Sequence, residues 1–209
     1  TALSTITGNT VKNISIAGAM NGTSDFNTPF AAIYLTTGIA TISGNLIGDT
    51  TTTGSITYTT TSNSGSHIMG ICNYAGGSVT ANHNSMGGIT LTAGGTGAIN
   101  FTGIRSAVSA SQAFTGKHNT IGGNVPSSIQ NNTLLTSRTI VGMDILAGCS
   151  VIASNTIRNL KSCGFYGMFI SGSGHSIRHN EIYGLQTNLA QFLPSRKGDY
   201  DFARQRHWL

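Results

Sequence analysis

The densest group of residues able to do chemistry is the stretch SIRHNEIYGL at residues 176–185, in a chain of which only 8% is charged. It places Arg178, His179 and Glu181 within four consecutive positions. An imidazole, a guanidinium and a carboxylate held together could carry out acid–base catalysis. Whether they form a site depends on the elements that hold them, so the surrounding pattern decides their role.

That stretch is one copy of an internal repeat. An apolar residue, an Asn three positions later and a second apolar residue two beyond that recur as ITGNTV, ISGNLI, IASNTI and IRHNEI. The Asn residues of these copies are Asn9, Asn45, Asn155 and Asn180, with weaker copies at Asn82 or Asn84 and at Asn119. A residue at a fixed place in a repeat usually serves the fold. We therefore assign Asn180 to the scaffold and expect its three charged or aromatic neighbours to be solvated.

A second recurring segment, a small residue followed by alternating residues, precedes most copies. It begins at Ala32, Gly70, Gly103, Gly142 and Gly167. Short strand-like segments separated by turn residues, in a repeat of about 25 to 39 residues, are typical of a stacked solenoid. The abundance of Gly (28 residues), Thr, Ser and Asn, with few helix-forming residues, favours an all-β chain.

These repeats resemble the right-handed parallel β-helix proteins of the pectin-lyase-like superfold, of the bacterial secreted or surface type. The resemblance implies a single-stranded right-handed solenoid of about six coils over residues 1–190, because parallel crossovers are nearly always right-handed. Residues 191–209 differ in composition and are expected to be a basic tail or cap. The motif Asn residues would form a ladder at a turn, and the apolar positions would fill the interior.

Successive copies of the repeat differ in length almost entirely in the segment that follows the motif Asn. This difference predicts insertions at one corner of the solenoid. Two polar segments, residues 50–66 and 124–138, are expected to be loops or short hairpins there. Because Thr50–Thr53 and Thr57–Thr61 would lie inside one insertion, we do not expect a flat Thr array that binds ice or another crystal surface.

One column of residues is predicted to point outward along a single face. It contains Tyr34, Cys72, Arg105, Asp144 and Phe169. An exposed ion pair between Arg105 and Asp144 is the simplest interpretation, and such a pair contributes under about 1 kcal/mol. The alternative is a carbohydrate-contacting strip, and the candidate ligand-binding residues are then Tyr34, Arg105, Asp144 and Phe169.

Enzymatic function has little support among the residue types. A polysaccharide lyase or glycoside hydrolase would need a calcium site or paired carboxylates, and the chain has six acidic residues. The paired-Asp and Asn-Thr-Asp motifs of polygalacturonase-like families are missing, and GSGHS lacks the second Gly of their Gly-His-Gly. Only Arg105, Asp144, Arg178 and Glu181 could take part, and we assign no catalytic residue.

Metal and cofactor sites are not expected either. Four of the six histidines, His67, His83, His118 and His175, are expected at different places around the coil. The cysteines Cys72, Cys149 and Cys163 have no metal-type spacing. We therefore predict no metal ligands and no cofactor.

Together these observations favour a non-catalytic module of an extracellular or cell-surface protein, a stalk or adhesive unit that binds a polysaccharide or a surface protein. A carbohydrate-active enzyme, or a fragment of one, is the alternative. Basic residues form no run before the tail, so no nucleic-acid partner is expected. No apolar run is long enough to span a membrane, and open strand edges would permit end-to-end or edge association.

Overall fold

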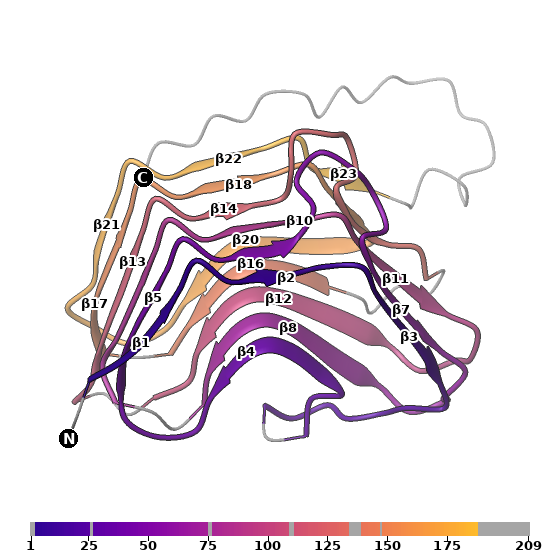
Figure 1. The fold of residues 1–209 in the computed structure, drawn as a ribbon, viewed down its shortest axis with the longest axis horizontal. Helices are drawn as coiled ribbons and strands as arrows, with labels where there is room; N and C mark the ends of the chain where they lie inside the picture. Colours follow the sequence, from indigo (N-terminus) through magenta and orange to yellow (C-terminus); the bar gives the residue numbers. More distant parts are fainter. Residues whose placement is uncertain are drawn as a thin grey trace.

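The computed structural model describes residues 3–25, 27–74, 77–108, 111–133, 139–146 and 148–187. Strands that follow one another along the chain run around a trapezoid, and each returns beside the strand four positions earlier (Figure 1). The strands form four parallel sheets, which we call sheets A to D in chain order. The described residues contain strands and no helix, so the prediction of an all-β parallel solenoid is confirmed.

The strands are distributed regularly among the sheets. Sheet A contains β1 (Leu3–Thr7), β5 (Ile39–Ser43), β9 (Val79–Asn82), β13 (Ala113–Lys117), β17 (Gly148–Ala153) and β21 (Ser176–Arg178). Sheet B contains β2 (Thr10–Val11), β6 (Leu46–Gly48), β10 (Ser85–Gly87), β14 (Thr120–Ile121), β18 (Thr156–Arg158) and β22 (Glu181–Tyr183). Sheet C contains β3 (Ile14–Gly18), β7 (Ile56–Thr60), β11 (Ile89–Ala93), β15 (Ile129–Asn131), β19 (Leu160–Ser162) and β23 (Gln186–Thr187). Sheet D contains β4 (Phe30–Leu35), β8 (Ser66–Asn73), β12 (Ile99–Ser106), β16 (Thr139–Ile145) and β20 (Gly164–Ile170).

Equivalent residues of successive coils stand next to one another. Ile6 pairs with Ile42 in sheet A, and Ile152 pairs with Ile177. Because neighbouring strands in a sheet lie about 4.8 Å apart, each column of side chains has that spacing. The right-handed winding stays a prediction, as does the division into a solenoid over 1–190 and a tail over 191–209. The tail lies outside the described residues.

Apolar columns fill the interior, as predicted. The residues expected inside that are fully buried are Ile42, Ile47, Ile71, Ile104, Met143, Ile152 and Ile157. Each such side chain stabilises the fold by roughly 1.5 to 3 kcal/mol. Ile177 and Ile182, also predicted to be inside, are 41% exposed. They lie on β21 and β22, the last strands of their sheets, so no further described strand of sheet A or sheet B covers them.

The motif Asn residues form a continuous ladder at the corner between sheets A and B. Its members are Asn9, Asn45, Asn84, Asn119, Asn155 and Asn180. Of the two candidates for the weaker copy, Asn82 and Asn84, the ladder residue is therefore Asn84. The Oδ1 atom of Asn119 accepts bonds from the backbone N–H (3.0 Å) and the Nδ2 group (2.9 Å) of Asn84. The Nδ2 group of Asn119 donates in turn to Asn155 Oδ1 at 2.9 Å and to Ala81 O at 2.8 Å. The four inner members of the ladder are buried, and their amides are satisfied by the neighbouring coils.

The residue before each ladder Asn has a left-handed backbone. These residues are Gly8, Gly44, His83, His118, Ser154 and His179, with φ between 54° and 67°. Glycine adopts this conformation freely, and histidine is among the residues enriched in it. The position of His179 in the opening stretch therefore follows from the corner geometry.

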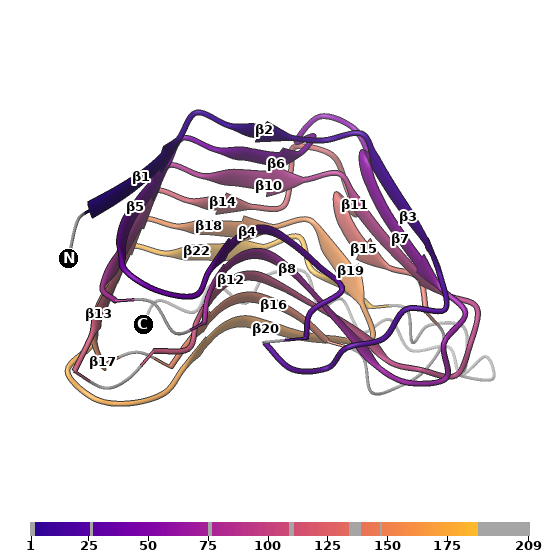
Figure 2. The same ribbon diagram turned by 60° about the horizontal axis from the view of Figure 1, so that its bottom comes forward.

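A glycine column explains the shape of sheet D, whose strands arch toward sheet B (Figures 1 and 2). A Cβ atom on Gly103 would lie 2.7 Å from Gly142 O and 2.9 Å from the Ile121 side chain of sheet B. A Cβ atom on Gly142 would likewise clash with the Ile157 side chain, and one on Gly167 with the Ile182 side chain. The predicted small-residue column thus lets the sheet B side chains pack directly on the sheet D backbone, which makes the outer face of sheet D concave.

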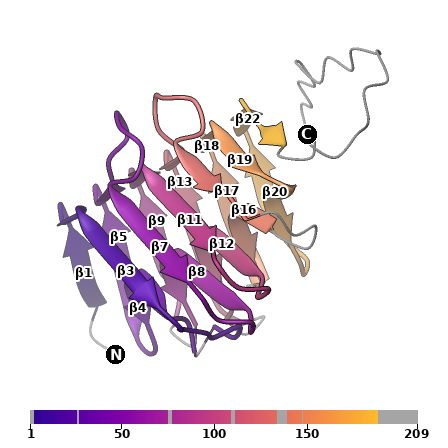
Figure 3. The ribbon, with the colours of Figure 1, turned by 90° about the vertical axis from the view of Figure 1, so that its right-hand side faces the viewer.

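The two predicted insertions are shorter than expected. Residues 56–60 form β7, and residues 129–131 form β15, so both polar segments contain a regular strand of sheet C. That part of the prediction is wrong because Thr57, Thr59 and Gln130 point outward while Ile56, Tyr58 and Ile129 are buried inside. The loops at residues 49–55 and 122–128 connect sheets B and C, and Figure 3 shows them projecting beyond the strands in purple and pink.

Threonines do occupy matching outer positions, contrary to expectation. In sheet C, Thr57 pairs with Thr90 and Thr59 with Thr92. In sheet A, Thr41 pairs with Thr80. The reason for not expecting a Thr array therefore no longer applies. The array on sheet C is nevertheless short, because Gln130 stands at the matching position in the next coil.

Candidate functional site

The predicted column on sheet D exists with the predicted register. Arg105 stands between Cys72 and Asp144, Tyr34 pairs with Cys72, and Asp144 pairs with Phe169. The side chains follow inward-pointing residues of the same strands and so lie on the outer face of sheet D. The sequence therefore placed all five residues of the column correctly relative to one another.

The ion pair between Arg105 and Asp144 has a third member. The guanidinium of Arg105 contacts Asp144 Oδ2 through Nη1, and its Nε lies 2.5 Å from Asp25 Oδ1. All three side chains are largely shielded, with side-chain exposures of 12–16%. Two carboxylates therefore share one guanidinium in a partly buried cluster, where the attraction is stronger than in an exposed pair.

Asp25 belongs to a strap, residues 20–25 and 27–29, which connects β3 to β4. The Oη group of Tyr34 donates to Asp25 O at 2.9 Å. The backbone N–H of His67 donates to Gly22 O at 2.7 Å, and the hydroxyl of Thr28 donates to His67 O at 2.5 Å. These bonds hold the strap against the first two strands of sheet D.

The strap corrects the prediction that the column is exposed throughout. Cys72 is fully buried and Asp144 is only 9% exposed, whereas Phe169 is 46% exposed. Tyr34 is partly buried and bonded to the strap. Only the Phe169 end of the column is open to solvent, because the strap is a non-repeating segment that folds over the other end.

The burial of this cluster changes its ionisation. Desolvation, and then the nearby charge of Arg105, lower the pKa of His67 to about 4, so its ring is neutral at pH 7. Desolvation also raises the pKa of Cys72 to about 12, which makes its thiol unreactive at neutral pH. The pKa of Asp144 is raised by desolvation, which outweighs the opposing effect of Arg105.

His67 gives the stability a pH dependence. In the unfolded chain its ring takes up a proton near pH 6.5, but in the folded chain only near pH 4. The unfolded state binds more protons between these values, so His67 lowers the free energy of unfolding as the pH falls, by about 2 kcal/mol from pH 7 to pH 5. His67→Gln keeps a group able to bond Thr102 Oγ1, which lies 2.8 Å from His67 Nε2. Denaturant unfolding at pH 7 and pH 5 should show that this decrease in the free energy of unfolding is absent from the variant. An unchanged pH dependence would contradict the role given to His67.

An exposed aromatic pair stands beside the charged cluster. Tyr166 and Phe169 are 55% and 46% exposed, and their rings meet edge to face with centroids 5.9 Å apart. Both lie on β20, and Phe169 is the register neighbour of Asp144. The face therefore combines an apolar surface with the carboxylate of Asp144 one strand away and the guanidinium of Arg105 two strands away.

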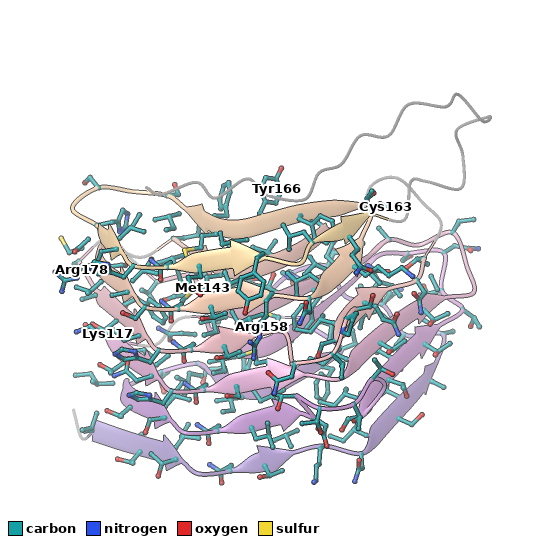
Figure 4. The ribbon with its side chains drawn as sticks, turned by 90° about the horizontal axis from the view of Figure 1, so that it is seen from above. Lys117, Met143, Arg158, Cys163, Tyr166 and Arg178 are labelled. Atoms are coloured by element: carbon teal, nitrogen blue, oxygen red, sulfur yellow. The ribbon has the colours of Figure 1, made fainter. Side chains whose placement is uncertain are left out.

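The opening stretch does not join this site. Arg178 ends β21 in sheet A, and Glu181 begins β22 in sheet B, so both lie on faces other than sheet D. Figure 4 shows Arg178 and Lys117 at one edge of the molecule, away from Tyr166. The four residues named for an enzymatic alternative are thus split, and only Arg105 and Asp144 come together.

Two histidines share a column, contrary to expectation. His83 and His118 stack with ring centroids 4.8 Å apart and planes 10° from parallel. Nearly parallel rings direct their nitrogen lone pairs side by side and not toward one metal ion. No group of three or more metal-ligating side chains occurs among the residues that the structure describes.

The sequence missed Asp25, His67 and Tyr166 as members of the site. Nothing in the sequence indicated that Asp25 and His67 belong to the site, because the strap contacts Arg105 in a different coil. Strict alternation counted back from Phe169 would place Tyr166 inside. It lies outside because Gly167 and Met168 both face the interior, which breaks the alternation at that point.

The geometry defines a parallel β-solenoid with a concave sheet that carries a charged cluster and exposed aromatic rings. No protein-family model matches the chain, and no curated protein or solved structure is significantly similar to it. In the described ranges, no helix has the length and apolar character that would let it cross a membrane.

Proposed function

We propose that this chain is a non-catalytic solenoid module of a secreted or cell-surface protein, and that it binds a saccharide on the outer face of sheet D. The binding residues are Tyr166 and Phe169, with Asp144 and Arg105 beside them. The module acts as a stalk or adhesive unit whose coils present this face at a fixed position.

The observation that carries the proposal is the exposed aromatic pair next to a charged cluster. Aromatic side chains on a solvent-facing strand offer a flat apolar surface for the C–H face of a sugar ring. Carboxylate and guanidinium groups close to that surface can bond sugar hydroxyls. Because β20 sits in a stacked sheet, both rings are presented on a rigid element and little ordering is needed on binding.

A binding function fits this cluster better than catalysis does. The carboxylates of Asp25 and Asp144 are both paired with the Arg105 guanidinium, which opposes their action as a nucleophile or base. His67 is covered by the strap and bonded to Thr102. The enzymatic alternative, a polysaccharide lyase or hydrolase, would require one of these groups to be released.

Removing the aromatic pair should weaken saccharide binding at least tenfold. An array of neutral, amino and acidic oligosaccharides identifies binders, and calorimetry then compares the unaltered chain with Tyr166→Ala and Phe169→Ala. Tyr183→Ala is a matched control, since Tyr183 is also 46% exposed but lies on sheet B. Equal affinities for the Phe169 and Tyr183 variants would contradict the proposed site.

The same oligosaccharides distinguish binding from turnover. We expect them to be recovered intact after prolonged incubation with the chain. Depolymerisation that is lost in Asp144→Asn would overturn the non-catalytic proposal and favour the enzymatic one.

A further inference from the structure

We infer that the saccharide bound on sheet D carries no acidic group, and that amino sugars with a free ammonium bind more tightly than their neutral counterparts. This inference rests on the proposed function and specifies the ligand class of that site. It is carried by the charges of the cluster and by one buried carboxylate oxygen.

The cluster carries a net negative charge. Arg105 supplies one positive charge, while Asp25 and Asp144 supply two negative charges. His67 adds none at neutral pH, because its pKa is about 4. The guanidinium faces carboxylates on two sides, so an anionic ligand approaching it would meet two negative charges at close range.

One acceptor atom of the cluster remains unused. Oδ1 of Asp144 is buried and accepts no hydrogen bond from the described residues, whereas Oδ2 is bonded to Arg105. A buried carboxylate oxygen without a donor is costly. Since an ionised carboxylate only accepts, the groups that would satisfy it are donors, such as a hydroxyl or an ammonium.

The position of the oxygen connects it to the aromatic surface. Asp144 and Phe169 are register neighbours on adjacent strands, about 4.8 Å apart. A sugar ring stacked on Phe169 therefore lies within one or two strand spacings of a negative charge in a shielded environment. A carboxylate or sulfate on that sugar would be repelled, and an ammonium would be attracted.

The test compares three tetrasaccharides of similar size: one of glucosamine, one of N-acetylglucosamine and one of galacturonic acid. At pH 6 and low salt, we expect the glucosamine tetrasaccharide to bind about fivefold tighter than the acetylated one, and the galacturonate to bind weakest. The difference should shrink in high salt, because screening weakens the interaction between charges.

Charge-removing variants locate the effect. Asp144→Asn and Asp25→Asn each neutralise the net charge and should abolish the preference for the ammonium sugar. Asp49→Asn is the control, because Asp49 is bonded to Thr51 in the loop between sheets B and C. It removes the same charge elsewhere and should leave the preference unchanged.

The outcomes separate this inference from the proposed function. Tightest binding of the galacturonate, or an ammonium preference that survives in both cluster variants, would overturn the inference and leave saccharide binding intact. If none of the saccharides on the array or in this set binds in a way that depends on Phe169, both proposals fail.

Discussion

Asn119→Ala should lower the free energy of unfolding by about 3 to 5 kcal/mol, which is a large share of the stability of a typical domain. The side chain is buried in the middle of the ladder and forms four hydrogen bonds with neighbouring coils. Its removal leaves the backbone N–H of Asn84 without its acceptor and Ala81 O without the amide donor. Each buried group without a partner costs about 1 to 3 kcal/mol.

The first member of the ladder provides the control. Asn9 is exposed, and its side chain donates to Asn45 Oδ1 and Thr7 O. Asn9→Ala should cost under about 1 kcal/mol, since water can replace these bonds. Denaturant unfolding followed by circular dichroism measures both variants, and equal losses would contradict the buried ladder.

Gly103→Ala should cost about 3 kcal/mol, the upper end of the range for forcing an extra methyl group into a packed core. The new Cβ would lie within 3 Å of Gly142 O and of the Ile121 side chain. A backbone oxygen in the next coil cannot move without shifting sheet D against its neighbours. The substitution therefore tests whether the arch of sheet D is set by direct contact with sheet B.

Gly94→Ala is the matched control for that substitution. A Cβ on Gly94 would meet its nearest neighbours, Thr61 and Thr60, at 3.7 and 3.8 Å, which is ordinary contact. We expect its unfolding midpoint to stay close to that of the unaltered chain. If Gly103→Ala is equally well tolerated, the proposed contact between sheets B and D does not exist.

The sequence predicted the features that repeat. Asn45, Asn155 and Asn180 could be aligned because the same backbone corner recurs in each coil and requires the same side chain. The register of Arg105 with Asp144 followed from the glycine that precedes each of them at a fixed distance. Periodic structure leaves periodic residues, so these predictions needed no knowledge of distant contacts.

The features that do not repeat were missed. Nothing in the sequence around Asp25 indicates that it reaches Arg105, because the strap crosses from one coil to others. For the same reason Asp144 was expected to be exposed and is instead buried. Thr57 was placed in a loop because its neighbours are polar, although alternation with Ile56 and Tyr58 is the signal of a strand with one buried face.

The most direct test of stacked coils is nuclear magnetic resonance of the side-chain amides. Asn119 and Asn155 are 36 positions apart, yet Asn119 Nδ2 lies 2.9 Å from Asn155 Oδ1. Stacked coils predict cross-peaks between the side-chain amide protons of these two residues, and slow exchange of those protons with water. Rapid exchange without such a cross-peak would show that neighbouring coils are not in register, and the fold and the sheet D site would both be wrong.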